Sequence, residues 1–341
     1  MFCLPLGFSP DSSLLAAGCG DGAIRVYNSG TGRMVYNLNP PKGGDADMPT
    51  TAIRFRPTMT HSKTRNVLLA VNADGTASHW HITSGKCLHT ITEENNQLFC
   101  VDYRPDGSIF ATAGKDYCVR IYDEATKTLS TTLMGGRTAD NPGHSNRVFS
   151  LKFKPDDPNL LISAGWDNTV QIWDLRIETS VKSIFGPHIC GDAADICGDR
   201  ILTGSWRPAD QLEVWDFGTG KLLESIPWCP DANALGSPEP CMLYAAKFSN
   251  TGGGRLIGAG GSGANEAKLF DRKFSNKLVG TVQGMTRGVF SLDFSHDDTK
   301  VAVAGGDAAI RILNIQSCEA AALVDNAANT QAAAAASAAT E

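Results

Sequence analysis

Two carboxylates lie close together in the segment 162–174, which reads ISAGWDNTVQIWD and contains Asp167 and Asp174. A pair of positioned acids is a common arrangement for general acid–base catalysis. An aspartate in a small-residue turn is equally suited to a structural role, because its side chain binds the backbone amides that follow it. A single copy of the segment does not distinguish these two interpretations, so the surrounding elements have to be considered.

The segment is one of seven similar phrases. They end at residues 28, 81, 123, 174, 216, 271 and 314, so the steps between them are 53, 42, 51, 42, 55 and 43. A self-similar unit of 42 to 43 residues with occasional insertions is typical of the four-stranded blades of a propeller. We therefore predict one all-β domain over residues 1–324 and an alanine-rich, flexible tail over residues 325–341.

Composition agrees with a closed ring of repeats, which shares one core and overrides the usual length of a domain. Of 341 residues, 42% are hydrophobic, and 35 Gly with 16 Pro fit many short strands joined by tight turns. No run of about 18 apolar residues is present, which predicts no membrane insertion. Residues 1–8, MFCLPLGF, lack the basic start and long apolar centre of a signal peptide.

Ten cysteines are scattered without a C-x-x-C pair, as expected for reduced thiols inside a cell. We expect a cytoplasmic protein, with the nucleus and ciliary or cytoskeletal structures as alternatives. The net charge of −6 argues against a nucleic-acid partner, although the basic stretch 61–65 leaves a local patch open.

Within each unit the pattern is that of strands. In residues 147–157, RVFSLKFKPDD, the apolar Phe149, Leu151 and Phe153 alternate with Ser150 and Lys152. A small-residue strand, a Gly/Asp turn, a third strand and a variable fourth strand follow. We expect residues 1–8 to be the first strand of blade one and residues 318–324, CEAAALV, to be the fourth strand of blade seven. The ring then closes by packing of faces; a chain truncated before Met1 is the alternative.

These features resemble the WD40 repeat family, with Trp-Asp endings at 173–174 and 215–216 and degenerate endings elsewhere. The resemblance implies a single seven-bladed propeller of four-stranded antiparallel blades. It also implies a hydrogen-bonded tetrad in the fourth repeat, formed by His144, Ser163, Asp167 and Trp173. The fifth repeat offers a looser version in His188, Thr203, Asp210 and Trp215. Asp167 is then interpreted as a turn residue and Asp174 as a strand end, so both acids are structural.

Insertions into the period indicate which face is elaborated. Residues 39–50, 134–143 and 227–240 join the outer strand of one blade to the inner strand of the next, and such connections share the top face. The insertions 207–211 and 261–266 lie between second and third strands, on the same face. Only residues 58–66 enlarge the opposite face.

Aromatic residues point to the same face. Trp166 and Trp206 occupy equivalent turns of adjacent blades, and the first strands place four further rings near the channel mouth, those of Phe99, Phe149, Tyr244 and Phe290. Rigid aromatics bury a large area at low entropic cost and suit a binding entrance. The alternatives are packing between blades for the first-strand residues and a lid over neighbouring loops for the two Trp residues.

Other chemistry is weakly indicated. His79 and His81 lie on one face of a strand, but no third ligand at useful spacing accompanies them, so we predict no metal. The glycine clusters 252–254 and 258–263 lack the Lys-Ser/Thr and helix of a phosphate loop, so we predict no cofactor.

The sequence is compatible with three functions. The first is a non-enzymatic scaffold, a monomeric propeller that binds peptides or subunits of a larger assembly. The second is a substrate receptor of a cullin-4 ubiquitin ligase, because residues 161–176 resemble its docking box with Asp174 and Arg176 as the contact residues. The third is a propeller enzyme, for which no convergent catalytic groups are visible.

Overall fold

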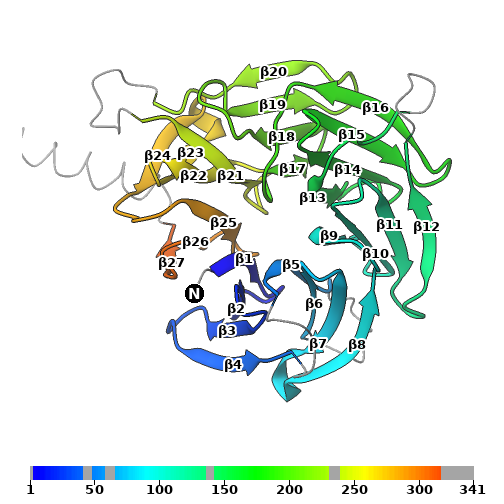
Figure 1. Ribbon diagram of the computed structural model, residues 1–341. Coiled ribbons are helices and arrows are strands. Elements are labelled where there is room, and N and C mark those ends of the chain that lie inside the picture. The colour runs from blue at the N-terminus through cyan, green and yellow to red at the C-terminus, as the bar shows by residue number, and fades with distance from the viewer. Residues whose placement is uncertain (1–2, 41–47, 58–65, 136–141, 230–238, 316–341) are drawn as a thin grey trace, which may run out of the picture.

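The computed structural model describes residues 3–40, 48–57, 66–135, 142–229 and 239–315, and it consists of seven small antiparallel sheets arranged in a ring (Figure 1). Six sheets have four strands, and the seventh has three among the described residues. Consecutive strands pair within each sheet, and the first strand lies innermost (Figure 1). The predicted all-β seven-bladed propeller is confirmed.

In each of the first four blades the strands follow one another in chain order from the innermost to the outermost (Figure 1). Blade one comprises β1 (Cys3–Phe8), β2 (Leu14–Cys19), β3 (Ile24–Asn28) and β4 (Met34–Leu38). Blade two comprises β5 (Thr50–Phe55), β6 (Val67–Asn72), β7 (Thr76–His81) and β8 (Lys86–Thr92). Blade three comprises β9 (Leu98–Tyr103), β10 (Ile109–Gly114), β11 (Val119–Asp123) and β12 (Leu129–Leu133). Blade four comprises β13 (Val148–Phe153), β14 (Leu160–Gly165), β15 (Thr169–Asp174) and β16 (Thr179–Phe185).

The remaining blades follow the same order. Blade five comprises β17 (Ala194–Cys197), β18 (Arg200–Gly204), β19 (Leu212–Asp216) and β20 (Leu222–Ser225). Blade six comprises β21 (Cys241–Phe248), β22 (Leu256–Gly263), β23 (Ala267–Asp271) and β24 (Lys277–Val282). Blade seven comprises β25 (Val289–Phe294), β26 (Lys300–Gly305) and β27 (Ile310–Asn314). Two short 3-10 turns, η1 (Ile82–Ser84) and η2 (Arg272–Phe274), follow third strands.

The core lies between adjacent blades. Val148 and Phe153 of β13 pack with Val119 of blade three, whereas Ile162 of β14 joins a cluster with blade five. All six residues of β15 are buried. Strands covered on both faces read as near-continuous apolar runs. The second strands follow this pattern, as LLISAG in β14 shows, whereas the third strands also carry buried polar side chains such as Gln171.

Aspartates shape the turns at both ends of the blades. At the top, Asp167 accepts hydrogen bonds from the Thr169 backbone and hydroxyl, at 3.2 and 2.9 Å. At the bottom, Asp216 accepts from the Thr219 amide at 2.6 Å. Because a short carboxylate side chain satisfies amides two or three residues ahead, it stabilises tight turns. The recurrent acids therefore hold the connections of the blades.

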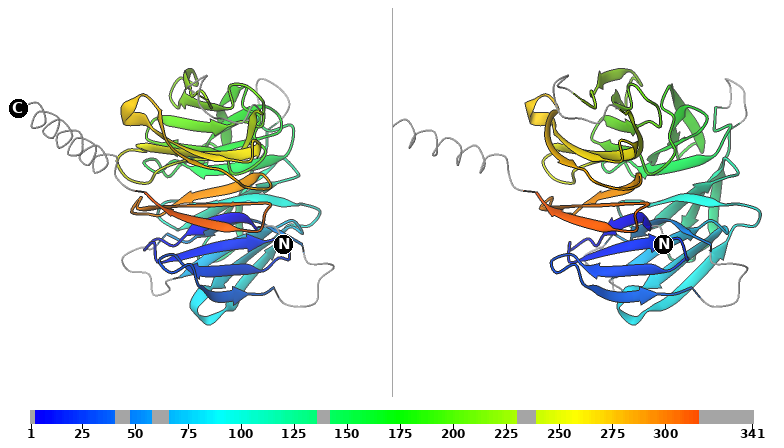
Figure 2. Two further views of the ribbon diagram at one scale, coloured as in Figure 1. Left: turned by 90° about the vertical axis from the view of Figure 1, so that its left-hand side faces the viewer. Right: turned by 60° about the vertical axis from the view of Figure 1, so that its left-hand side comes forward.

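The ring closes where β1 packs beside β25 (Figure 2). The amide of Leu6 donates to Ser291 Oγ at 2.9 Å, and the amide of Phe8 donates to Asp293 Oδ2 at 2.8 Å. Residues of blades one and seven also share an apolar cluster. The predicted first strand in residues 1–8 is confirmed as β1. The predicted strand over residues 318–324 lies outside the described residues.

Most of the predicted insertions also lie outside the described residues, because 41–47, 58–65, 136–141 and 230–238 are not described. The insertion predicted at 261–266 begins inside β22, where Gly263 pairs with Cys241. That segment is therefore partly a strand extension, made possible by the greater length of β21.

Candidate functional site

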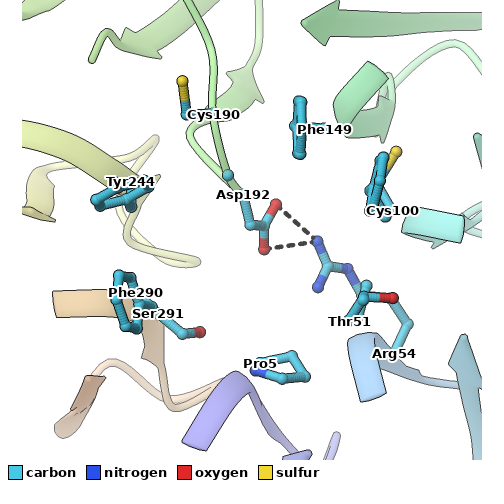
Figure 3. Close-up of a pocket in the computed structure, with 13 residues that line it drawn as sticks. Pro5, Thr51, Arg54, Cys100, Phe149, Cys190, Asp192, Tyr244, Phe290 and Ser291 are labelled. Atoms are coloured by element: carbon cyan, nitrogen blue, oxygen red, sulfur yellow. Dashed lines mark hydrogen bonds and ion pairs between the residues drawn. The ribbon is translucent and has the colours of Figure 1, made fainter. Parts of the chain in front are cut away.

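The candidate site is the mouth of the central channel. The first strands β9, β13, β21 and β25 place Phe99, Phe149, Tyr244 and Phe290 around a cavity of about 220 Å³. All four rings are half-buried. Figure 3 shows Phe149 and Tyr244 on opposite sides of the cavity, with Phe290 beside Ser291. The structure thus brings together the four first-strand aromatics named from the sequence.

The six aromatic residues form two clusters. In the first, Phe99 stacks on Phe149 with ring centroids 4.7 Å apart, and Phe149 meets Trp166 at 5.0 Å. In the second, Tyr244 lies 5.2 Å from Phe290 and 6.5 Å from Trp206. Each Trp residue thereby continues a line of rings from the cavity onto the surface.

The two Trp residues are each 37% exposed, so neither is a buried lid. Trp166 donates from Nε1 to Cys190 Sγ at 3.0 Å, and the Arg147 guanidinium lies 5.2 Å from its ring centroid. Burial raises the pKa of Cys190 to about 11, so this thiol accepts the hydrogen bond in its neutral form. The Trp166 indole is thus held by its hydrogen bond and its ring contacts while part of it faces solvent.

An ion pair forms the floor of the cavity. Arg54 Nη2 reaches both carboxylate oxygens of Asp192, at 3.0 and 2.9 Å (Figure 3). Lys247 Nζ lies 3.4 Å from the same carboxylate. Burial alone would raise the pKa of Asp192, but the attraction of Arg54 and Lys247 outweighs it and holds the pKa well below its usual range. Asp192 is therefore ionised throughout the physiological range.

Below the rim, the first strands carry charges of alternating sign. From blade two to blade seven the equivalent residues are Arg54, Asp102, Lys152, Asp195, Lys247 and Asp293. Blade one has Gly7 at this position. A ring of seven positions cannot alternate without one interruption, and the neutral Gly7 lies between Asp293 and Arg54. The alternation is visible when the first strands are aligned, although sequence reasoning missed it.

Each charge in this ring connects neighbouring blades. Three cation–carboxylate pairs join blades two to three, four to five and six to seven: Arg54–Asp102 at 3.2 Å, Lys152–Asp195 at 3.7 Å and Lys247–Asp293 at 3.0 Å. The same three aspartates accept amides of the following blade, from Phe153 at 2.9 Å, Phe248 at 2.9 Å and Phe8 at 2.8 Å. The ring charges are thus occupied by structural contacts and leave the aromatic rim as the accessible part of the mouth.

The tetrad residues of blade four are connected as the resemblance implies. His144 contacts Asp167 Oδ2 through Nδ1 and Ser163 Oγ through Nε2, both at 2.7 Å, and Trp173 Nε1 donates to Ser163 Oγ at 2.7 Å. Burial would raise the pKa of Asp167, but its hydrogen bond with His144 lowers it overall. These contacts lie inside the blade rather than at the mouth.

The looser tetrad of blade five is not formed. Trp215 Nε1 donates to Thr203 Oγ1 at 2.9 Å, but His188 Nδ1 contacts Asn168 Oδ1 of blade four at 2.6 Å. Asp210 is exposed and accepts from Ser225 at 3.1 Å. His188 does not reach Thr203, because its segment continues towards the channel as far as Asp192. Of the expected tetrad partners, only Trp215 contacts Thr203.

Blade three contains a buried network that sequence reasoning missed. Glu93 accepts hydrogen bonds from Thr112 at 2.6 Å, Tyr122 at 2.9 Å, Arg120 at 2.8 Å and Asn96 at 2.8 Å. Glu93 stands ahead of β9 much as His144 stands ahead of β13. The sequence could have indicated this network, because Glu93 replaces the tetrad histidine and Tyr122 replaces the tetrad tryptophan.

Two other candidate groups are separated from the mouth. Asp174 and Arg176 pair with each other in the turn after β15, at the opposite end of the blade, with Arg176 Nε 2.9 Å from Asp174 Oδ1. The side chain of Arg176 is 60% exposed. His79 is buried against Glu124 at 3.0 Å, whereas His81 contacts Ser84 in an exposed turn. The two histidines therefore do not converge, and within the described ranges no group of three metal-ligating side chains occurs.

Comparison with known proteins gives a match to the family model described as WD domain, G-beta repeat, over residues 2–28, 85–123, 136–174 and 276–314. These segments end at four of the seven repeat ends read from the sequence. Among the described residues, no helix is long and apolar enough to cross a bilayer.

Similar curated proteins come from several eukaryotes. The chain is 28% identical over 52% of its length to "Periodic tryptophan protein 2 homolog" of Dictyostelium discoideum, covering 18% of that protein. It is 23% identical over 73% of its length to "Cell division cycle 20.1, cofactor of APC complex" of Arabidopsis thaliana, covering 61% of that protein. It is 23% identical over 72% of its length to "Target of rapamycin complex subunit LST8" of Mus musculus, covering 72%. The chain thus spans less than two thirds of the first two relatives.

Proposed function

Because the chain belongs to the WD40 repeat family of β-propellers, we propose that it is a non-enzymatic binding subunit inside the cell. In this proposal it holds peptides or subunits of a larger assembly on the face that carries the channel mouth. The coarse role is consistent with its relatives, since two of them are named as a complex cofactor and a complex subunit. The contact surface is inferred from this chain's own residues.

The observation that carries the proposal is the continuity of the two aromatic clusters. Trp166 and Trp206 are half-exposed, and each leads through Phe149 or Tyr244 into the same cavity. Large aromatic side chains in a desolvated depression are typical of binding hot spots. Contiguous exposed apolar area is unfavourable in water and favours a covering partner.

The charge ring supports this role by keeping the mouth rigid. The ion pairs below the cavity tie the first strands together. These strands carry Phe99, Phe149, Tyr244 and Phe290, against which the turn residues Trp166 and Trp206 pack. A preorganised surface loses little entropy on binding, which increases affinity. The same ring offers no carboxylate free of cations, which favours binding over catalysis.

The test compares the native protein with Trp166→Ala/Trp206→Ala and with Phe274→Ala, an exposed aromatic 49% accessible at the other end of blade six. Partners that co-purify with the native chain are identified, and affinity is then measured with the purified partner. We expect the double variant to lose at least ~2 kcal/mol, about thirtyfold in affinity, with little change in melting temperature. The Phe274 variant should bind normally.

Intact binding by the double variant, together with a marked loss of stability, would show that both indoles are packing residues. In that case the recognition surface lies elsewhere on the propeller.

A further inference from the structure

The rim of the channel mouth is built from β-bulges. In five blades the residue three positions before the ring charge is skipped in the pairing of the first two strands, and these residues are Thr51, Phe99, Phe149, Tyr244 and Phe290. A bulge re-aims the side chain of the extra residue relative to the regular alternation of a strand. In all five blades the bulged residue lines the cavity.

Blade five places a carboxylate at this rim position. Asp192 stands three residues before the ring charge Asp195 and lines the same cavity. The strand β17 begins only at Ala194 and has four residues, whereas the other first strands have six or eight. The chain therefore reaches the rim through residues 186–192, here called the crossing segment, which lead from the outer strand β16 to the channel.

The crossing segment contacts both exposed tryptophans. The Sγ atom of Cys190 accepts the hydrogen bond from Trp166 Nε1 at 3.0 Å. The backbone carbonyl of His188 accepts from the amide of Trp206 at 2.8 Å. The place of this segment therefore sets where both indoles lie relative to each other.

The crossing segment also packs against the strand that carries the second aromatic cluster. A Cβ atom at Gly191 would lie 2.3 Å from the carbonyl oxygen of Tyr244, so the close approach of the two backbones requires glycine. The carbonyl of Asp192 accepts from the amide of Ala246 at 3.3 Å. One short segment thus contacts residues of both aromatic clusters.

The end of the crossing segment is fixed from the opposite side of the channel. Arg54 belongs to blade two and Asp192 leads into blade five, so their ion pair spans the channel (Figure 3). Arg54 is held on its own side, because Nε donates to Asp102 at 3.2 Å and Nη1 donates to the Ile53 carbonyl at 3.0 Å. The side chains of the pair are 15% and 26% exposed, so solvent screens their attraction weakly.

We propose that Asp192 is a positioning residue of the binding surface. Its ion pair with Arg54 fixes the crossing segment, and the segment holds the two exposed indoles in one relative arrangement. Because these indoles are assigned to the contact surface, this role rests on the proposed function. Two groups that are already fixed relative to each other lose less entropy when a partner contacts both, so affinity increases. Asp192 thus acts on affinity through the indoles.

The first experiment follows the indoles by fluorine NMR of the full chain labelled with 5-fluorotryptophan. The chain has six tryptophans, and replacing each one by Phe assigns its signal. Asp192→Asn removes the charge with little change of size and should shift or broaden the signals of both Trp166 and Trp206. Cys190→Ala removes the acceptor of Trp166 and should change the Trp166 signal but not that of Trp206.

Asp271→Asn is the matched control. Asp271 is a fully buried acid paired with Arg255 at 2.9 Å, at the end of blade six opposite to the mouth. Both Asn variants should melt lower, because each loses one member of an ion pair, but Asp271→Asn should leave both indole signals unchanged. Arg54→Lys is a milder change to the pair across the channel and should change both signals by less than Asp192→Asn does.

Two results of the NMR experiment would overturn the proposal. In the first, the signals of Trp166 and Trp206 are the same in Asp192→Asn or Arg54→Lys as in the native chain. In the second, Asp271→Asn changes them as much as Asp192→Asn does, which would reflect a general loosening of the fold.

The second experiment measures affinity for the purified partner that co-purifies with the native chain. Asp192→Asn should bind about tenfold more weakly, while Asp271→Asn should bind as the native chain does. In the Trp166→Ala/Trp206→Ala background, Asp192→Asn should weaken binding by less than about twofold further, because its effect passes through the indoles. A full additional loss in that background would show that Asp192 contacts the partner itself, which would overturn the positioning role.

Two outcomes separate a failure of this role from a failure of the proposed function. Normal binding by the Trp166→Ala/Trp206→Ala variant would show that the proposed contact surface is wrong, and the role of Asp192 in binding would fall with it. Weak binding by that variant together with normal binding by Asp192→Asn would leave the contact surface in place and overturn the positioning role alone.

Discussion

At the scale of single residues, the hydrogen-bonding capacity of the turn aspartate Asp167 is occupied by neighbouring donors. Asp167 accepts from His144, from the Ser145 amide and from both the amide and hydroxyl of Thr169. A buried carboxylate with this many donors is held ionised and has no free lone pair directed at a ligand. Asp167 therefore stabilises the turn and the tetrad of blade four.

Removal of this carboxylate should destabilise the fold. Asp167→Ala leaves the buried His144 ring without its acceptor and removes the acceptor of the exposed Ser145 amide, at a cost of about 1–3 kcal/mol in the free energy of unfolding. The control is Glu94→Ala, which removes an exposed carboxylate and should be nearly neutral. Chemical denaturation measures both. An unchanged unfolding curve for Asp167→Ala would contradict the structural role of this residue.

At the scale of elements, the inner strands both form the channel mouth and connect neighbouring blades. Their starts carry the aromatic rim, and their lower ends carry the alternating charges that join blades. Burial would lower the pKa of Lys152, but Asp102 and Asp195 on either side raise it overall. The cation is thus stabilised by both neighbouring strands.

Replacement of Lys152 should test its attraction to Asp102 and Asp195, because different substitutions should lower the free energy of unfolding by different amounts. Lys152→Met keeps the apolar stem and removes the charge, which leaves two acids facing each other and costs about 1–2 kcal/mol. Lys152→Asp places three acids on successive strands and should cost more. Lys221→Asp, on an exposed turn, is the matched charge reversal and should cost little. If Met and Asp were equivalent at position 152, packing rather than charge would explain the effect.

At the scale of the whole molecule, one seam differs from the rest. Six junctions join blades that are consecutive in the chain. Blades one and seven are not consecutive, and the described parts of these blades are joined by packing of β1 against β25 and β26 and by hydrogen bonds such as that from the His296 amide to Ser12 Oγ at 2.9 Å. Blades one and seven can separate without separating any two blades that are consecutive in the chain. We therefore expect local opening of the ring to begin at this seam.

Two equivalent substitutions test that expectation. Asp293→Ala removes the acceptor of the Phe8 amide at the seam, and Asp102→Ala removes the acceptor of the Phe153 amide between blades three and four. Each leaves a buried amide unpaired, at about 1–3 kcal/mol. Hydrogen exchange should rise selectively in β1 for Asp293→Ala, without a comparable local rise in β13 for Asp102→Ala. Equal local effects would show that all seams are equivalent.

The amino-acid sequence by itself determined the repeat period, the strand pattern and the turn acids, because these depend on residues within about one blade. Asp167 and Thr169 are two positions apart, and such a contact follows from local backbone geometry. The placement of aromatics at the starts of the first strands was predictable for the same reason, since strand order sets which end faces the mouth.

Only the tertiary structure decided which side chains meet across blades. Arg54 and Asp192 are 138 positions apart, and their pairing depends on the path of the segment before β17 across the channel. That same path separated His188 from Thr203. Because the period of a strand pattern states which face a residue occupies, but not how far each blade is rotated against the next, contacts between blades appear only when the ring is assembled.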